Sequence, residues 1–234
     1  STVECLLLPA SVTRICNLAF AYCNSLCEIE FPENSQLSII EDEAFTHSRI
    51  ETFTVPCHLK HLKCSAFNRC QYLEKFFFSQ NSTLTTIDAN LFYGTSLEEI
   101  IIPDNIIQIN EKAFCCCYGL REVKFSENSN LSMIEKRSFA STSIEKIRIP
   151  KHVTEIKEST FEGCNNLRLI EIPPDSEIKR IGKGAFSGSS IECLTIPSLL
   201  VELENGWCEQ TSNLFKFTIM PGNPCFKSFK DEFI

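Results

Sequence analysis

The sequence predicts an α/β fold built as a solenoid, a stack of about ten similar coils. Three observations predict it. The motif apolar-x-x-apolar-x-apolar recurs at alternating steps of 23 and 24 residues, a Phe follows once in nearly every repeat, and Pro, Asn-Ser and Cys positions recur every 47 residues. A unit of this length cannot bury its own apolar face, so successive units have to stack into one continuous core.

The apolar motif that opens each repeat is interpreted as a short strand. Side chains alternate across a strand, and the strands of successive coils should pair into a parallel sheet. We expect residues 1–234 to form a single domain, in which residues 220–234 leave the pattern and act as a C-terminal cap. The repeats start at Val3, Leu26, Ile50, Leu73, Leu97, Leu120, Ile144, Leu167, Ile191 and Leu214.

The residues that follow the strand explain why the repeat length alternates. Odd repeats place a Pro six residues after their start, whereas even repeats carry an Asn-Ser or Asp-Ser turn that is two residues longer. Asn and Asp suit turns because their side chains bond to nearby backbone groups. The prolines are Pro9, Pro56, Pro103, Pro150 and Pro197, and the turns begin at Asn34, Asn81, Asn128 and Asp175.

The last part of each repeat ends in a small residue followed by Phe, five residues after an Ile or Leu. We interpret this part as a short helical turn, because acidic or hydroxyl residues such as Glu41-Asp42-Glu43 often open it and suit a helix N-terminus. Repeat nine departs from the pattern with Trp207-Cys208. The aromatic residues should stack into a spine formed by Phe20, Phe45, Phe67, Phe92, Phe114, Phe139, Phe161 and Phe186.

The segments LEEIIIPDNIIQINEKAFCCCYG (97–119) and IEKIRIPKHVTEIKESTFEGCNN (144–166) show the complete pattern, and this pattern resembles the BspA-like leucine-rich repeat family. The resemblance covers nearly the whole chain. It implies a horseshoe-like solenoid with the parallel sheet on the concave face and short helical turns on the convex face. Members of this family include surface antigens and adhesins of bacteria and are expanded in parasitic protists. Such a family indicates fold far better than function.

The outward side chains of the sheet form the predicted binding surface. Phe77 and Ile101 are apolar and should be adjacent, with Lys124, Arg148 and Lys146 following as a basic step. An aromatic anchor beside basic residues resembles a protein-binding hot spot. The alternative is that Phe77 and Ile101 merely pack against long neighbouring side chains, since single exposed apolar residues are common. The predicted partner-binding residues are Lys75, Phe77, Glu99, Ile101, Lys124, Lys146 and Arg148.

The 14 cysteines do not by themselves indicate disulfides. Cys23, Cys70, Cys117 and Cys164 lie 47 residues apart, so the ladder they form should leave them roughly 10 Å from one another, too far for a bridge. We expect them to be buried thiols. Cys5 and Cys27 occupy equivalent positions of adjacent strands and could form a bridge. Cys115 and Cys116 are expected to be solvent-facing or half-buried.

One cluster has the residue types of a zinc site: Cys57, His58, His61 and Cys64. Leu59 and Leu62 fall on core positions of the repeat, however, so we favour exposed loop residues and predict no metal and no cofactor. Two glycosylation sequons, at Asn81 and Asn130, fall in turns that should be exposed, and chance matches in such turns remain an alternative.

The composition of the chain also argues against several classes of function. The formal net charge of −8 argues against nucleic acid as a partner, because binding phosphates requires Lys and Arg. No apolar run is long enough to span a membrane, and no catalytic constellation can be identified. We therefore predict a non-enzymatic protein-binding module at the cell surface or outside the cell. The alternatives are an intracellular, cytoplasmic scaffold and, less favoured, a thiol- or metal-dependent enzyme.

The ends of the chain lead to two further expectations. Because the chain begins inside a repeat and shows no signal peptide, we expect it to be a segment of a longer protein. Its first coil would then lack a cap, and an uncapped strand edge would be able to associate end to end with another chain.

Overall fold

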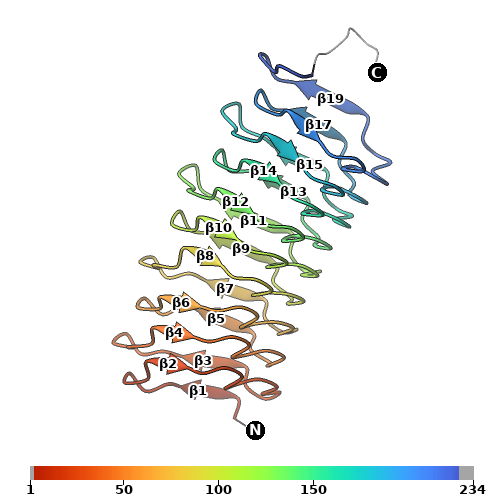
Figure 1. Ribbon diagram of the computed structural model, residues 1–234. Helices are drawn as coiled ribbons and strands as arrows, with labels where there is room; N and C mark the ends of the chain where they lie inside the picture. Colours follow the sequence, from red (N-terminus) through yellow and green to blue (C-terminus); the bar gives the residue numbers. More distant parts are fainter. Residues whose placement is uncertain (1–2, 227–234) are drawn as a thin grey trace.

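Residues 3–226 are described by the computed structural model, in which the chain winds into a stack of coils along one axis, with its two termini at opposite ends (Figure 1). We number the coils 1 to 10 from the repeat starts. Each coil except the last contributes two short strands, so the described residues make about nine complete turns. The predicted cap reaches residue 234, and its residues 227–234 lie outside the described part.

The front sheet contains the strands that open the repeats. All pairings in it are parallel, and the register matches the repeat frame, for example Leu6 with Ile29 and Val123 with Ile100. The ten strands are β1 (Cys5–Leu7), β3 (Glu28–Glu30), β5 (Thr52–Thr54), β7 (Lys75–Phe77), β9 (Glu99–Ile102), β11 (Glu122–Phe125), β13 (Lys146–Arg148), β15 (Leu169–Glu171), β17 (Cys193–Ile196) and β19 (Lys216–Ile219).

The second sheet contains strands of two residues, each with an Ile or Leu pointing inward. These strands pair in parallel in three groups of three. They are β2 (Arg14–Ile15), β4 (Ile39–Ile40), β6 (His61–Leu62), β8 (Thr86–Ile87), β10 (Gln108–Ile109), β12 (Met133–Ile134), β14 (Glu155–Ile156), β16 (Arg180–Ile181) and β18 (Glu202–Leu203).

The predicted helical turns are wrong: the described residues contain no helix, and the fold is a β-solenoid rather than α/β. The reason lies in the amides around each Phe. The Phe20 amide donates a hydrogen bond to Ala44 O of the next coil. The amides two residues before and two residues after Phe20 also donate to the next coil, to Asp42 O and Thr46 O. The amides in between close tight turns within the coil, such as Ala19 to Cys16 O. A helix would need all of these amides for its own ladder.

This alternation is possible because the residues two before and two after each Phe adopt left-handed backbone conformations. In coil 5, Lys112 has a φ of 55° and Cys116 a φ of 61° on either side of Phe114. The same pair recurs in coils 1 to 9, with Cys208 at the Phe position of coil 9. Phe186 donates to Trp207 O, so coil 9 keeps the repeat geometry despite its different residues.

The core is the predicted Phe spine. Successive rings from Phe20 to Phe186 lie nearly parallel, with centroids 5.1 Å to 6.1 Å apart, as between Phe45 and Phe67 and between Phe67 and Phe92. Phe53 and Phe76 from the front strands pack edge-on against this spine in coils 3 and 4. Full burial of a side chain of this size is worth about 1.5–3 kcal/mol, so the stack is a principal source of stability.

The turns of the even coils depend on the Ser that follows each Asn or Asp. Ser35 Oγ accepts a hydrogen bond from the amide of Leu37, and Ser129 and Ser176 repeat this contact from buried positions. The prediction had assigned the bonding to the Asn and Asp side chains. Here the Ser hydroxyl satisfies a buried amide that the longer turn would leave without a partner.

Candidate binding surface

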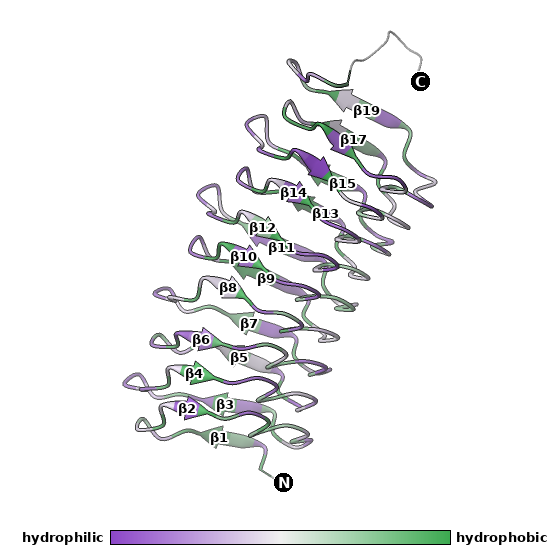
Figure 2. Cartoon of the chain, viewed as in Figure 1, coloured by the Kyte–Doolittle hydropathy of each residue, from purple (hydrophilic) through white to green (hydrophobic). Residues whose placement is uncertain are grey.

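The front sheet carries the predicted outward column of side chains in the predicted register. Thr54 pairs with Phe77, Ile101 with Lys124, and Arg148 with Glu171. All seven predicted binding residues are exposed, from Lys75 on β7 to Arg148 on β13. Figure 2 shows hydrophobic colouring through most of β9, whose residues after Glu99 are all isoleucine.

The front sheet is not continuous, a feature that the sequence interpretation missed. Its strands pair in twos, β1 with β3, β5 with β7, β9 with β11, β13 with β15 and β17 with β19. Between β7 and β9 one backbone bond from Glu98 N to Glu74 O joins the coils at the start of the strands. The sheet therefore opens after every even coil, once per 47-residue unit.

The opening between β7 and β9 forms a groove with a volume of about 580 Å³. Phe77 and Ile101 line it, with exposed fractions of 51% and 62%. Lys75 and Glu99 stand at the strand starts, and Phe78 and Pro103 form the wall beyond the strand ends. Phe77 and Ile101 are thus brought to one open apolar site, rather than being covered by long neighbouring side chains.

The basic residues predicted to follow this groove, Lys124, Arg148 and Lys146, are partly neutralised by carboxylates. Lys124 Nζ lies 2.8 Å from Glu99 and 3.1 Å from Glu122, and the hydrogen bonds that Lys124 donates to these carboxylates raise its pKa. Arg148 pairs with Glu127. Within residues 3–226, Lys75 and Lys146 have no carboxylate at salt-bridge distance. Lys146 and Arg148 belong to β13, two coils beyond β9, and do not line the groove.

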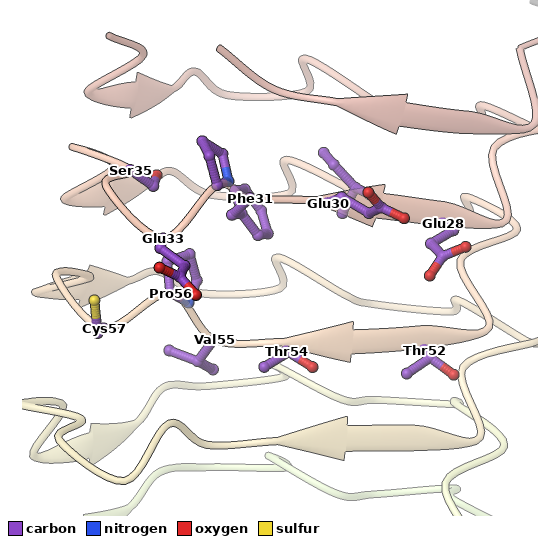
Figure 3. A pocket seen from close by; sticks show the side chains of 12 residues that line it. Glu28, Glu30, Phe31, Glu33, Ser35, Thr52, Thr54, Val55, Pro56 and Cys57 are labelled. Atoms are coloured by element: carbon purple, nitrogen blue, oxygen red, sulfur yellow. The ribbon is translucent and has the colours of Figure 1, made fainter. Parts of the chain in front are cut away.

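A second opening, between β3 and β5, has the opposite character. This groove, of about 370 Å³, is lined by Glu28 and Glu30 on one side and by Thr52 and Thr54 on the other (Figure 3). Ligand atoms of Cys5, Glu28 and Glu30 lie within 4.8 Å of one another. Desolvation, followed by the charges of Glu30 and Glu28, raises the pKa of the Cys5 thiol.

The predicted zinc set behaves as exposed loop. Cys57, His58, His61 and Cys64 are all exposed, while Leu59 and Leu62 between them are buried. His61 belongs to β6, so the segment is ordinary repeat backbone, as the core positions of Leu59 and Leu62 predicted. Asn81 and Asn130 are exposed as predicted, and the Asn130 amide donates to Asp104 O at 3.0 Å.

All fourteen cysteines are free thiols, and Cys5 and Cys27 do not form a bridge. Cys70, Cys117 and Cys164 are buried as predicted, whereas Cys23 in coil 1 is half-buried. Cys116 is half-buried as expected. The prediction for Cys115 is wrong, because this residue is buried beside the Phe spine with an exposed fraction of 8%.

The sequence matches a described family. The pattern of the BspA type leucine rich repeat region fits residues 2–103 and 85–215 in six copies. Among curated proteins no sequence matches this chain. Within the described residues no helix is long and apolar enough to cross a membrane.

Solved structures share the fold. A leucine-rich cell surface protein of Faecalibacterium prausnitzii is 22% identical over 93% of this chain, with a TM-score of 0.57. The pneumococcal vaccine antigen PcpA is 20% identical over 94%, with a TM-score of 0.63. A leucine-rich repeat protein of Bacteroides ovatus is 19% identical over 94% of this chain, which matches 73% of that protein, with a TM-score of 0.56. The chain spans 60% of the first structure and 62% of the second.

Proposed function

The chain belongs to the family of BspA-type leucine-rich repeat proteins, and on this premise we propose that it is a binding module that recognises a protein partner through its front sheet. The observation that carries the proposal is the groove between β7 and β9, where Phe77 and Ile101 are exposed together. Binding energy in protein interfaces concentrates in a few apolar anchors seated in pockets. The partner would insert an apolar knob, flanked by acidic groups that meet Lys75 and Lys146.

A binding role is proposed in preference to a catalytic one. The cysteines with clearly shifted pKa values have them raised, mainly by burial, as in Cys70, Cys117 and Cys164. A protonated thiol is a weak nucleophile. Beside the apolar groove, Lys124, Glu99 and Glu122 stand on strand positions and are held in surface ion pairs.

We further propose that the protein acts at the cell surface. Two structures with this fold are named as a cell surface protein and a vaccine antigen. A second candidate is an intracellular scaffold, which the fourteen free thiols favour because disulfides are rare in reducing compartments. End-to-end association through β1, where Leu7 is 61% exposed, stays a prediction.

Surface staining separates these two candidates. An antibody to this segment should stain intact cells, and the signal should disappear after the cells are shaved with protease. Staining that requires permeabilised cells would contradict the surface role and direct the search for partners to the cell's own lysate.

Substitution in the groove tests the binding site. With a partner identified among extracellular matrix and host proteins, Phe77→Arg and Ile101→Arg should each abolish binding measured by biolayer interferometry. Both side chains are exposed, so the melting temperature should not fall. Phe215→Arg, at a position 71% exposed on coil 10, is the matched control and should bind normally. Normal binding by both groove variants would show that the site lies elsewhere.

A further inference from the structure

All four tyrosines of the chain lie on one edge of the stack. Each occupies the segment between the Phe spine and the next front strand in one of the first five coils. We call this surface the tyrosine edge and define it as residues 20–26, 45–50, 67–73, 92–97 and 114–120. Tyr22, Tyr72 and Tyr118 are 64%, 53% and 70% exposed, and Tyr93 is half-buried. Exposed aromatic groups gathered in one place mark binding surfaces.

Three of the tyrosines contact a His or Arg side chain of the neighbouring coil. The Tyr22 ring stacks on His47 at 4.9 Å, the Arg49 guanidinium lies 5.1 Å from the Tyr72 ring, and Arg69 lies 5.9 Å from the Tyr93 ring. Each contact joins neighbouring coils. The rings and cations therefore hold one another in place and need little further ordering when a ligand binds.

Two hollows run along this edge and meet. One, of about 270 Å³, extends from Tyr22 to Tyr72, and the other, of about 480 Å³, extends from Tyr93 to Tyr118. Arg69 and Gln71 line both hollows, which therefore lie next to each other along the edge. No aliphatic side chain lines either hollow; the other lining groups are amides, hydroxyls, glycines, one imidazole and one thiol.

The charge of the edge opposes that of the whole chain. The chain carries a net charge of −8, yet the five segments of the tyrosine edge contain Arg49, Arg69 and His47 and no Asp or Glu. The nearest carboxylate contact is that of Glu51, 3.9 Å from Arg49. In coils 6 to 9 the equivalent segments have no aromatic residue other than the spine Phe, and they include Glu162 and Glu209.

We propose that the tyrosine edge is a second binding site, distinct from the front groove, which takes an acidic oligosaccharide. The faces of exposed tyrosines stack on the C–H faces of sugar rings, and the amides and hydroxyls bond to sugar hydroxyls. Arg49 and Arg69 receive carboxylates of uronate-type sugars, which guanidinium groups bind in bidentate geometry. The absence of aliphatic side chains from both hollows favours a polar ligand over an apolar knob of a protein.

The spacing of the rings fits an extended glycan. Tyr22, Tyr72 and Tyr118 belong to coils 1, 3 and 5, and coils are about 4.8 Å apart, so these rings recur at roughly 10 Å. Each sugar ring of an extended chain is about as long as one coil is thick. A short acidic oligosaccharide lying along the stack would meet a tyrosine at every second ring, with Arg49 in the coil between Tyr22 and Tyr72.

Titration calorimetry on the whole chain tests the proposal. The probes are hexasaccharides of hyaluronan and of polygalacturonate, with maltohexaose and cellohexaose as neutral chains and hexaglutamate as an acidic peptide. At least one acidic hexasaccharide should bind, at least tenfold more tightly than the neutral chains, and the affinity should fall with salt. Tyr72→Ala and Arg69→Gln should each weaken binding about tenfold or more, while Tyr72→Phe keeps most of it.

The controls separate this site from the front groove. Phe215→Ala removes an exposed aromatic outside the edge and Phe77→Arg disrupts the front groove, and both should leave sugar binding unchanged. The proposal is overturned by acidic hexasaccharides that do not bind, by equal binding of neutral chains, or by an unchanged Tyr72→Ala affinity in variants with normal circular dichroism. Binding of hexaglutamate alone, with loss in Arg69→Gln, would assign the edge to acidic peptides instead.

Discussion

At the scale of single residues, the cysteine ladder shows how a repeat alternates its side chains. Coils 1, 3, 5 and 7 place Cys three residues after Phe, and the even coils 2 to 8 place Ser or Thr there. The Cys117 thiol donates to Phe92 O at 2.9 Å and lies 3.3 Å from Thr95 Oγ, both in the preceding even coil. Cys70 and Cys164 make the same contacts. The 47-residue spacing predicted buried thiols, but the hydroxyl partner requires knowing which coils face each other.

Burial of this ladder predicts a dependence of stability on pH. Desolvation raises the pKa of Cys117 to about 12, from an ordinary value of 9.0. The folded state therefore holds this proton more tightly than the unfolded state. The contribution of the protonated Cys117 thiol to the free energy of unfolding is fully present below pH 9 and is lost as the pH rises toward 12. By pH 11 the loss should be about 2–3 kcal/mol.

Urea unfolding at pH 8 and pH 11 measures this loss. The free energy of unfolding should fall more in the parent chain than in Cys117→Ala, which cannot ionise at this position. Tyrosines and lysines titrate in both proteins and cancel in the difference. Cys57→Ala, at an exposed thiol, should follow the parent. Identical pH dependence in the parent and Cys117→Ala would refute the argument.

At the scale of the element, the segment around each Phe is where sequence reasoning failed. Residues such as Glu43, Lys112 and Arg137 are ordinary helix formers, yet each adopts a φ of 55° to 57°. The hydrogen bonds that their amides donate to the neighbouring coil stabilise the fold by more than the left-handed conformation costs. A signal was present in Gly94, Gly163 and Gly188, which all stand two residues after Phe. Their shared position two residues after Phe indicates a left-handed backbone there.

The left-handed positions predict a reversal of ordinary substitution effects. At Lys112, with a φ of 55°, Lys112→Gly should be more stable than Lys112→Val by about 1–2 kcal/mol, because a β-branched residue resists this conformation. Lys136 is the matched control, since it also pairs with Glu111 but has an ordinary φ. There, Lys136→Gly should be the less stable variant, by about 0.5–1 kcal/mol.

Urea midpoints of the four variants check this reversal. At each position the Gly and Val variants lose the same surface ion pair. The difference in stability between them therefore reports the effect of the backbone conformation. If Val were at least as stable as Gly at position 112, the left-handed geometry of the turn would be wrong.

The binding surface was predictable to the extent that register determines it. Alternation along a strand was enough to place Phe77, Ile101 and Lys124 on one outward column, and their pairing confirms this. The groove itself was not predicted, because a repeat pattern gives no indication of where hydrogen bonding between strands lapses. The ion pair between Lys124 and Glu99 was missed for a related reason: it joins neighbouring coils across the sheet.

At the scale of the whole molecule, the pair of coils is the structural unit. Within a pair the front strands bond along their length, as β9 does with β11, whereas after each even coil the sheet opens. At that same boundary the opposite edge is tied by Cys–Thr or Cys–Ser contacts, such as Thr95 with Cys117. The boundaries after coils 2, 4 and 6 are thus held near the Phe spine and open at the front, which gives a regular stack its grooves.

Deletion of coils tests this unit. Removal of residues 97–143 takes out one odd–even pair and joins coil 4 to the odd coil 7, so Thr95 would meet Cys164 in place of Cys117. Removal of residues 97–119 takes out one coil and joins coil 4 to the even coil 6. Thr95 would then face Thr142, the ladder thiol would be missing, and two long turns would lie side by side.

We therefore expect the larger deletion to be the more stable protein. In urea, followed by circular dichroism, the chain without residues 97–143 should unfold cooperatively near the parent midpoint. The stability of such a stack is the sum of the stabilities of its coils and of the interfaces between neighbouring coils. After this deletion every remaining interface is still one between an odd and an even coil, as in the parent chain. The chain without residues 97–119 keeps more coils but gains a mismatched interface, and its midpoint should be clearly lower. Equal midpoints would mean that single coils are interchangeable and that the alternation in length does not determine how they stack.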